Sequence, residues 1–368
     1  MSGPETKRTL YRILPFGIIW LLSGWIFLIV EHAASDHFSH LPETAIKMDP
    51  TIFLLSSIAI TVVGLLIGLI EIKYLSRLFS HKRFVTKIFY KLIIYVLLFF
   101  LIGLLTFPFA ASLELDSSVL DSRVWEKYTD YFTSLSHFST IVQLGTALVV
   151  SLFYVEIRDY LGQGVLKNFF TGKYHKPIEE ERIFMFLDMK SSTTIAEKLG
   201  HVAYFDLLQN YYADISEPIV RYEGEIYQYA GDEIILSWKN STPTANNRCI
   251  HCFFDMKKAL QQKEAWYQKT FGLAPVFKAG IHLGKVTAGE IGKIKKEILF
   301  TGDPLNVAAR IQSLCNSYQV TLLVSSNLVH QMELGSDFEI LQVDKAHLRG
   351  KEASTELFTI SEKELSTL

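Results

Sequence analysis

The chain has 368 residues, of which 49% are apolar and 20% charged, with a formal net charge of −2 at pH 7. This length allows two or more domains, and the near-neutral charge gives no basic field of the kind that nucleic-acid binding needs. Three cysteines, an odd and sparse set, indicate a reducing compartment without a disulfide framework.

Four apolar runs in the first half are long enough to cross a bilayer, for which about 20 residues suffice. They cover residues 13–30, 52–70, 92–111 and 138–157. Lys7, Arg8 and Arg12 precede the first run, as in a signal peptide, but no small-residue cleavage site follows it and three more runs do, which favours a signal anchor. We expect an all-α four-helix transmembrane bundle over residues 1–157.

The charges beside these runs predict their orientation. The connection between the second and third runs is basic and carries Lys73, Arg77, Lys82, Arg83, Lys87 and Lys91. The outer two connections are mainly acidic, with Glu31, Asp36, Glu43 and Asp49 in one and Glu114, Asp116, Asp121, Glu126 and Asp130 in the other. The positive-inside bias therefore places both termini on the cytoplasmic side of a multi-pass inner-membrane protein.

Few ionisable residues fall within the runs. Glu71, Glu156 and Arg158 lie at cytoplasmic ends, where snorkelling to the interface is expected. We thus expect no chain of buried charges and no ion path, and interpret the bundle as an anchor, a dimerisation unit or a receptor. The first outer loop carries three histidines that are either solvated or form a metal or pH sensor: His32, His37 and His40.

Residues 158–181 form the predicted linker. Its apolar residues have helical spacing: Leu161, Val165, Leu166, Phe169 and Phe170. Several glycines weaken this helix, and Pro177 is expected to end it. Two interpretations stay open, an amphipathic spacer near the bilayer and a coupling helix that carries motion to the next domain.

Residues 182–368 predict one α/β or α+β domain, since strand and helix patterns alternate to its end. The expected strands cover residues 183–187, 225–229, 234–238, 276–282 and 297–300, and the expected helices cover 195–222, 245–268 and 304–315. Cys249 and Cys252 form a C-x-x-C pair without the second pair that zinc would need, so we expect them in the core.

Two aspartates end apolar strands in this domain. Asp188 is followed by a Ser/Thr-rich turn, and Asp232 follows Gly231 in a tight hairpin turn. If the two strands are neighbours, the carboxylates meet at one edge and suit Mg²⁺ and a polyphosphate. The backbone N–H groups of Met189, Ser191, Ser192 and Thr193 then form a phosphate cradle. The alternatives are a helix cap for Asp188 and a plain turn residue for Asp232.

A further element follows Gly302. Asp303 as cap and Pro304 at the first position predict the start of a helix. Asn306 and Arg310 are four residues apart and share a face, where an amide and a guanidinium suit a sugar oxygen and a phosphate. The alternative is a solvent-facing polar pair.

These motifs, Asp188, Gly231-Asp232, residues 280–284 and residues 302–310, resemble those of the class III nucleotide cyclases in order and spacing. The resemblance covers residues 181–360 and implies a ferredoxin-like, palm-like catalytic domain that pairs head to tail as a homodimer. It implies that Asp188, Asp232 and the Met189 backbone hold two Mg²⁺ or Mn²⁺ ions. It also implies that Asn306 and Arg310 of the other subunit act on the ribose and the transition state.

The resemblance further places Lys278 and Arg349 where the family has cationic phosphate contacts. The base-reading positions fall at Gln228 and Leu299, where the family usually has lysine and Asp or Thr. Gln228 is not the glutamate expected of a guanylyl enzyme, which favours ATP over GTP by analogy. The sequence leaves base choice and the signal read by the bundle open.

The function implied is a membrane-bound cyclase that makes cyclic AMP and pyrophosphate from ATP. Three alternatives are a guanylate cyclase, a silent nucleotide-binding or dimerisation module, and a diguanylate cyclase. The last should carry a Gly-Gly-Asp/Glu-Glu-Phe hairpin, and Ala230 to Ile234 does not match it.

Overall fold

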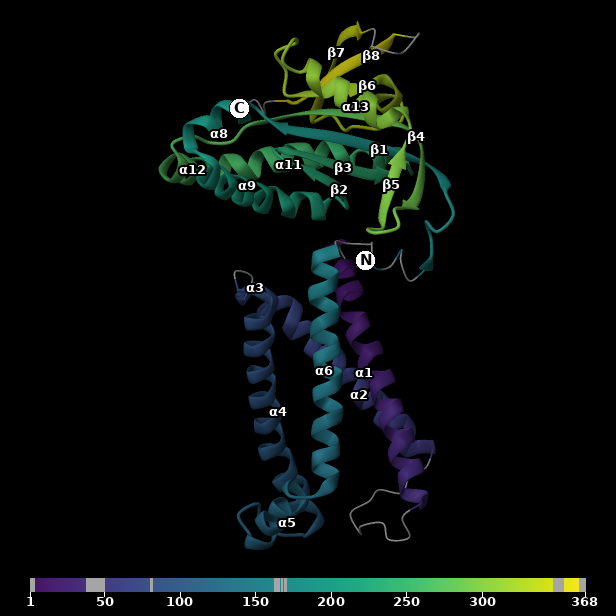
Figure 1. The fold of residues 1–368 in the computed structure, drawn as a ribbon, viewed down its shortest axis with the longest axis vertical. Helices are drawn as coiled ribbons and strands as arrows, with labels where there is room; N and C mark the ends of the chain where they lie inside the picture. The colour runs from purple at the N-terminus through teal and green to yellow at the C-terminus, as the bar shows by residue number, and fades with distance from the viewer. Residues whose placement is uncertain are drawn as a thin grey trace. The chain divides into compact units, whose positions relative to one another are not determined.

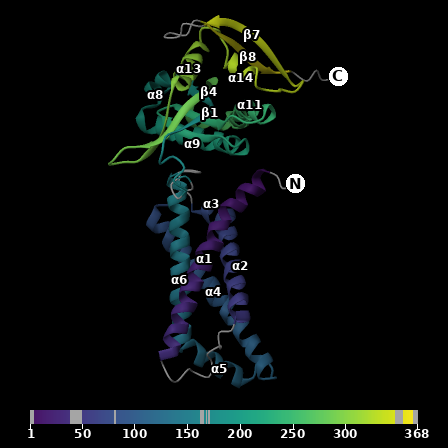
Figure 2. The same cartoon turned by 90° about the vertical axis from the view of Figure 1, so that its right-hand side faces the viewer.

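The computed structural model describes residues 4–37, 50–79, 82–161, 166, 168, 171–346 and 354–363. The chain divides into two compact units, Met1–Leu161 and Gly162–Leu368, each with its own hydrophobic core (Figures 1 and 2). His40, Arg349 and most of the apolar residues predicted for the linker helix lie outside the described residues.

The first unit is all helical, as predicted. Its elements are α1 (Pro4–His37), α2 (Pro50–Ile70), the π-helix η1 (Glu71–Leu75), α3 (Ser76–Leu78), α4 (Phe84–Glu114), α5 (Ser122–Phe132) and α6 (Leu135–Leu161). Four segments are long and apolar enough to span a membrane: Thr9–Val30, Phe53–Leu75, Phe84–Phe109 and His137–Leu161. This confirms the expected set of four long apolar helices.

Small residues let α1 and α2 approach closely. A Cβ atom on Gly64 would lie 2.7 Å from Cβ of Trp20, and one on Gly68 would lie 2.8 Å from Cγ of Phe16. The two glycines are four residues apart on α2, the spacing at which small residues line one face of a membrane helix and allow close packing.

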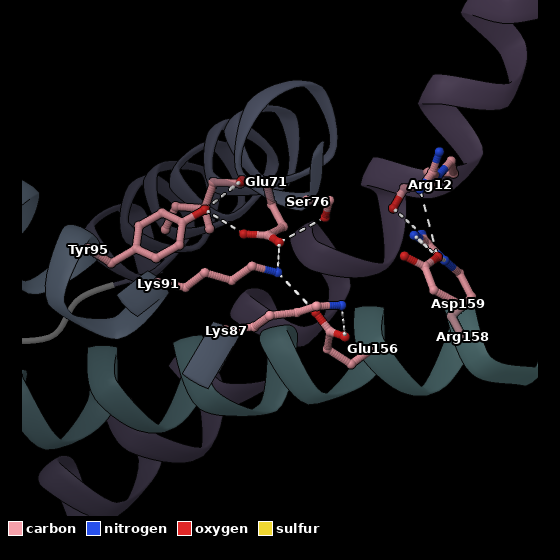
Figure 3. Close-up of polar contacts among 10 residues, drawn as sticks. Arg12, Glu71, Ser76, Lys87, Lys91, Tyr95, Glu156, Arg158 and Asp159 are labelled. Atoms are coloured by element: carbon pink, nitrogen blue, oxygen red, sulfur yellow. Dashed lines mark hydrogen bonds and ion pairs between the residues drawn. The ribbon is translucent and has the colours of Figure 1, made fainter. Parts of the chain in front are cut away.

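A buried ionic cluster joins three helices of this unit, and it contradicts the expectation that Glu71 and Glu156 snorkel to the interface (Figure 3). Lys91 Nζ lies 2.5 Å from Glu71 Oε1 and 3.0 Å from Glu156 Oε1, while Lys87 Nζ lies 3.3 Å from Glu156 Oε2. The side chains of Glu71 and Lys91 are 0% and 1% exposed. The prediction failed because the sequence shows only that each charged residue is near a helix end. The packing of the helices brings the opposite charges together in the interior of the unit.

Neutral donors complete the surroundings of Glu71. Ser76 Oγ donates to its Oε1 at 2.9 Å, and Tyr95 Oη donates to its Oε2 at 3.2 Å. Glu71 is also the first residue of η1, the π-helical turn between α2 and α3. Such turns are rare and concentrate at functional positions. Here the turn occurs where the chain must place a carboxylate among its partners.

A second group of polar contacts lies at the end of α6 (Figure 3). Arg158 pairs with Asp159 at 2.9 Å and donates to the backbone oxygen of Arg12 at 3.5 Å. Arg12 lies 3.8 Å from Asp159. Asp159 is about half exposed, so these pairs contribute little to stability compared with the buried cluster.

The second unit is built on a mixed eight-stranded sheet with the order β2-β3-β1-β4-β6-β8-β7, in which β5 also pairs with β4. The strands are β1 (Ile178–Met189), β2 (Glu225–Ala230), β3 (Glu233–Lys239), β4 (Phe277–Ile291), β5 (Glu297–Thr301), β6 (Leu322–Ser325), β7 (Phe338–Ala346) and β8 (Thr355–Glu362). Only β4 and β6 run parallel to each other among these pairs. β1 begins at Ile178, within the segment predicted as linker.

Its helices are α8 (Ser192–Leu199), α9 (His201–Arg221), α10 (Pro243–Asn246), α11 (Arg248–Gln262), α12 (Glu264–Phe271), α13 (Asp303–Leu314) and α14 (Ser326–Val329). The long helix predicted over residues 195–222 is two helices, because Gly200 adopts φ +76° between them. The helix predicted over 245–268 also breaks, at Asn247 and at Lys263. Breaks of one residue leave the apolar periodicity of the sequence almost unchanged, so the periodicity does not reveal them.

The two faces of the sheet carry different helices (Figure 1). Ile183, Met185 and Leu187 of β1 face the main core, which α9 and α11 cover. The alternate residues Phe184 and Phe186 face a smaller core that includes Ala308 of α13. Asp188 follows in the same alternation and so lies on the α13 side of the sheet.

Candidate active site

The structure brings the two predicted aspartates together at the end of β1. Asp188 lies opposite Glu233 on β3 and opposite Lys278 on β4, and Asp232 directly precedes Glu233 in the β2–β3 turn. Gly231 adopts φ +66° there, as the two-residue turn requires. Asp188 is not a helix cap, because the N-cap residue of α8 is Ser191.

The pKa of Asp188 is shifted by its surroundings. Partial burial raises the pKa of Asp188, and a hydrogen bond and charge repulsion from Asp232 raise it further. Lys278 and Gln312 oppose this shift and lower the pKa. Burial and the same two carboxylates also raise the pKa of Glu233. Negative charge is therefore concentrated here and would be relieved by a cation.

The oxygen donors fit a hard divalent cation. Carboxylates and backbone carbonyls suit Mg²⁺ and Mn²⁺, and Mg²⁺ is often held by one or two carboxylates together with substrate phosphates. Within the described part of the chain, no group of three or more His, Cys, Asp and Glu side chains forms a metal site. That Asp188, Asp232 and the Met189 carbonyl hold a divalent cation stays a prediction.

Lys278 lies beside Asp188, and its predicted role as a phosphate contact stays a prediction. Its Nζ is 3.4 Å from Asp188 Oδ2, and its side chain is 11% exposed. A cavity of about 490 Å³ adjoins it and is lined by Lys190, Ser191, Lys278, Cys315, Asn316 and Gln319. The lining is mainly polar and carries two ammonium groups, which suits an anion.

The turn after Asp188 is tightly held. Ser191 adopts φ +59°, and the N–H of Lys190 donates to the backbone oxygen of Val276 at 2.8 Å. Ser192 begins α8. The structure thus orders this turn, with the N–H of Lys190 already bonded to Val276, and the role of residues 189–193 as a phosphate cradle stays a prediction.

Gln312 is a site residue that the sequence motifs did not indicate. Its Nε2 donates to Asp188 Oδ2 at 2.9 Å, and its side chain is buried. One signal was available, since Gln312 falls on the buried face of α13 between Ile311 and Cys315. A polar residue within an apolar stripe is expected to have a hydrogen-bonding partner.

Tyr212 is a second residue that the motifs missed. Its Oη donates to the backbone oxygens of Gly231, at 2.9 Å, and Glu233, at 3.3 Å. Burial raises its pKa, so it remains a neutral donor. Tyr212 therefore fixes the hairpin turn that carries Asp232.

Gly280 permits α13 to lie against the sheet. A Cβ atom at this position would lie 2.2 Å from the backbone N of Gln312 and 2.6 Å from the backbone O of Ala308. These are backbone atoms, so they can move aside only if the whole helix moves.

Gly280→Ala is expected to displace α13, withdraw Gln312 from Asp188 and destabilise the unit by about 1–3 kcal/mol through overpacking. Thermal unfolding of the full-length protein measures the loss. Ala288→Gly, on the same strand as Gly280, is the control for a simple loss of packing. Gly200→Ala cannot serve as a control, because Gly200 has a positive φ that alanine does not readily adopt. Unchanged stability of Gly280→Ala would contradict the close approach.

The structure does not turn Asn306 and Arg310 toward the aspartates of their own chain. Both lie on α13, which begins at Asp303 with Gly302 rather than Asp303 as its N-cap. At about 100° per residue, they lie roughly 120° and 160° around the helix from Gln312, which faces Asp188. Asn306 is exposed, and Arg310 is partly buried.

The predicted base-reading residues Gln228 and Leu299 lie on β2 and β5, and the residues next to them in sequence are in contact. Gln228 is exposed on β2, beside an irregularity in its pairing with β3, and Leu299 is partly buried on β5. The rings of Tyr227 and Phe300 pack in a tilted arrangement with 5.1 Å between their centroids, and the Phe300 N–H donates to Tyr227 Oη at 3.4 Å. β2 and β5 are thus joined next to both positions.

Cys249 and Cys252 are buried in α11, as predicted for core residues. Burial raises the pKa of both thiols, to about 12 for Cys249, so neither is a reactive thiolate at neutral pH.

Comparison with known proteins agrees with this geometry. Residues 174–362 match the family model of the adenylate and guanylate cyclase catalytic domain. Adenylate cyclase 2 of Rhizobium meliloti (strain 1021) is 34% identical over 181 residues, which are 49% of this chain and 50% of that protein. The adenylate cyclase of Anabaena cylindrica is 25% identical over 183 residues, 48% of this chain and 36% of that protein.

Among solved structures, a bacterial light-regulated adenylyl cyclase matches with a TM-score of 0.52 at 21% identity, covering 63% of this chain and 67% of that one. This likeness concerns the fold. The chain spans half or less of the length of the curated relatives above. On the strength of the family match and of the catalytic fold, the chain belongs to the class III adenylate and guanylate cyclase family.

Proposed function

We propose that this protein is a membrane-bound cyclase that converts ATP into 3′,5′-cyclic AMP and pyrophosphate at a homodimer interface. The convergence of Asp188 and Asp232 at the end of β1, with Lys278 beside Asp188, carries this proposal. The resemblance to proteins named adenylate cyclases supports the choice of ATP.

Different residues of the chain have different proposed roles in the reaction. Asp188, Asp232 and the Met189 carbonyl would hold Mg²⁺ or Mn²⁺, two ions per site, together with the substrate phosphates. Such ions would supply Lewis-acid activation of the 3′-hydroxyl for in-line attack on the α-phosphate and charge neutralisation of the leaving pyrophosphate. The turn at Ser191, Ser192 and Thr193, with Lys278 and Arg349, binds the polyphosphate. No protein nucleophile is required.

A second copy of the chain completes each site. Because α13 turns Gln312 toward Asp188 and directs Asn306 and Arg310 elsewhere, we assign that pair to the site of the partner. There they orient the ribose and stabilise the charge of the transition state. The catalytic unit and the membrane bundle both take part in the dimer.

Mixing inactive variants tests this assignment. Asp232→Ala and Arg310→Ala are each expected to be inactive alone, whereas their co-expression restores about a quarter of wild-type activity. Half of random dimers are mixed, and each of these holds one complete site of two. Cyclic AMP formation by the purified mixture measures the recovery. A mixture as inactive as its parts would contradict sharing of the site between subunits.

We place the membrane domain at residues 1–157 and let the catalytic domain, predicted over 182–368, begin earlier because β1 starts at Ile178, with both termini cytoplasmic and the protein in the inner membrane. Four spans and the exposed basic residues Lys73, Lys82 and Arg83 between the second and third support this topology.

A product assay on ATP and GTP side by side, with Mg²⁺ and with Mn²⁺, tests the function. We expect cyclic AMP as the main product. Gln228→Lys is expected to raise the preference for ATP by about tenfold, since a charged donor to the adenine ring contributes about 1.5–3 kcal/mol. Thr287→Lys on β4 provides a control for added charge. Purified protein that cyclises neither nucleotide with either metal would refute the proposal.

The second candidate is a module that binds nucleotide without turnover. Leu299 favours it, because leucine cannot hydrogen-bond a base. Nucleotide binding that is unchanged in Asp232→Ala, with no turnover in the wild type, would support the module.

A further inference from the structure

We infer that Gln312 is a positioning residue, whose side-chain amide holds the carboxylate of Asp188 in the orientation that divalent-cation binding requires. This inference rests on the proposed function, because it concerns the same site.

The contact itself is specific. Gln312 Nε2 donates to Asp188 Oδ2 at 2.9 Å, and Lys278 Nζ lies 3.4 Å from the same oxygen. Because both donors act on one oxygen, the carboxylate cannot rotate about its Cβ–Cγ bond without losing both. The other oxygen is thereby assigned a fixed direction at the end of β1.

The donor is held by a rigid element. Val307, Ala308 and Ile311 are fully buried on the same side of α13, and the backbone N of Gln312 lies against Gly280 of β4. Gln312 itself is 6% exposed, so its side chain has little room for other rotamers. A group positioned by packed secondary structure orients a ligand more accurately than one on a loop.

The chemistry of an amide suits this place. A carboxamide N–H donates to the carboxylate without adding positive charge, whereas a second ammonium group at this distance would repel a bound divalent cation. Partners that orient a metal-binding carboxylate typically change metal affinity by about 10- to 100-fold when removed.

The test measures Mn²⁺ binding by electron paramagnetic resonance, on the full-length protein in detergent with 3′-deoxyATP, which lacks the attacking hydroxyl. Gln312→Met keeps the length of the side chain and removes the donor, so we expect Mn²⁺ to bind about tenfold more weakly. Gln312→Asn, which keeps an amide on a shorter arm, is expected to show the same loss. Gln262→Met, the same exchange at an exposed position of α11, should bind Mn²⁺ as the wild type does.

Unfolding in EDTA separates positioning from folding. We expect Gln312→Met to unfold at the wild-type temperature, because methionine suits the apolar face of α13. Wild-type Mn²⁺ affinity in a folded Gln312→Met or Gln312→Asn would overturn the inference. Asp188→Ala distinguishes this failure from failure of the proposed function: if it too binds Mn²⁺ as tightly as the wild type, the proposed site itself is wrong.

Discussion

Asp232→Ala is expected to reduce cyclic nucleotide formation by about a thousandfold, which corresponds to ~4 kcal/mol in the activation barrier. The carboxylate is one of only two proposed to hold the cations, and Asp188 alone cannot replace it. The substitution lies in a turn fixed by Gly231 and by the Tyr212 hydroxyl, so the fold should survive. Initial rates at saturating ATP, with Mg²⁺ and with Mn²⁺, measure the effect.

The matched control is Asp206→Ala, which removes an exposed aspartate from α9 in the same unit. It should retain wild-type activity. Asp232→Asn keeps the shape and removes the charge, and it should be about as inactive as alanine if the carboxylate binds a cation. An active Asp232→Asn would show that the residue serves the turn and not the chemistry.

Lys91→Met is expected to destabilise the helical first unit (Met1–Leu161) by about 3–5 kcal/mol, the usual effect of removing one partner from a buried ion pair. Glu71, fully buried, would keep only the neutral donors Ser76 and Tyr95. At roughly 2–4 °C per kcal/mol, the unfolding temperature should fall by about 10 °C. Thermal unfolding of the purified protein in detergent measures this shift.

A double substitution isolates the cause. Glu71→Gln combined with Lys91→Met removes both charges, so it should recover most of the lost stability. Lys73→Met, an exposed lysine in the same π-helical turn, is the matched control and should change little. A normal unfolding temperature for Lys91→Met would mean that water or lipid headgroups compensate Glu71 in place of the lysine.

The sequence predicted those parts of the site that depend on short-range signals. Gly231-Asp232 between two apolar runs predicts a hairpin. The strand that ends at Asp188 then brings its carboxylate to Asp232 if it pairs with that hairpin. Gln312 escaped because its contact depends on how α13 docks, which Gly280 on a distant strand controls. Motif spacing contains no information about such docking.

In the first unit, too, the sequence predicted the helices but not the contacts between them. Length and apolarity predicted its four long helices, since these are properties of each segment alone. The pairing of Glu71 with Lys91 and of Lys91 with Glu156 depends on the rotation of three helices about their axes. Residues near helix ends are compatible with either burial or exposure until that rotation is known.

The ionic cluster has a consequence for biosynthesis. Glu71 is synthesised first, then Lys87 and Lys91, and Glu156 last. A lone ionised side chain within a membrane helix costs about 2.5–3.5 kcal/mol on insertion scales, so each of these helices is better accommodated beside its partners than alone. Electroneutrality is reached only when α6 arrives, and α6 directly precedes the catalytic unit in the chain. If the helices insert in chain order, Glu71, Lys87 and Lys91 would together carry a net charge of +1 until α6 supplies Glu156.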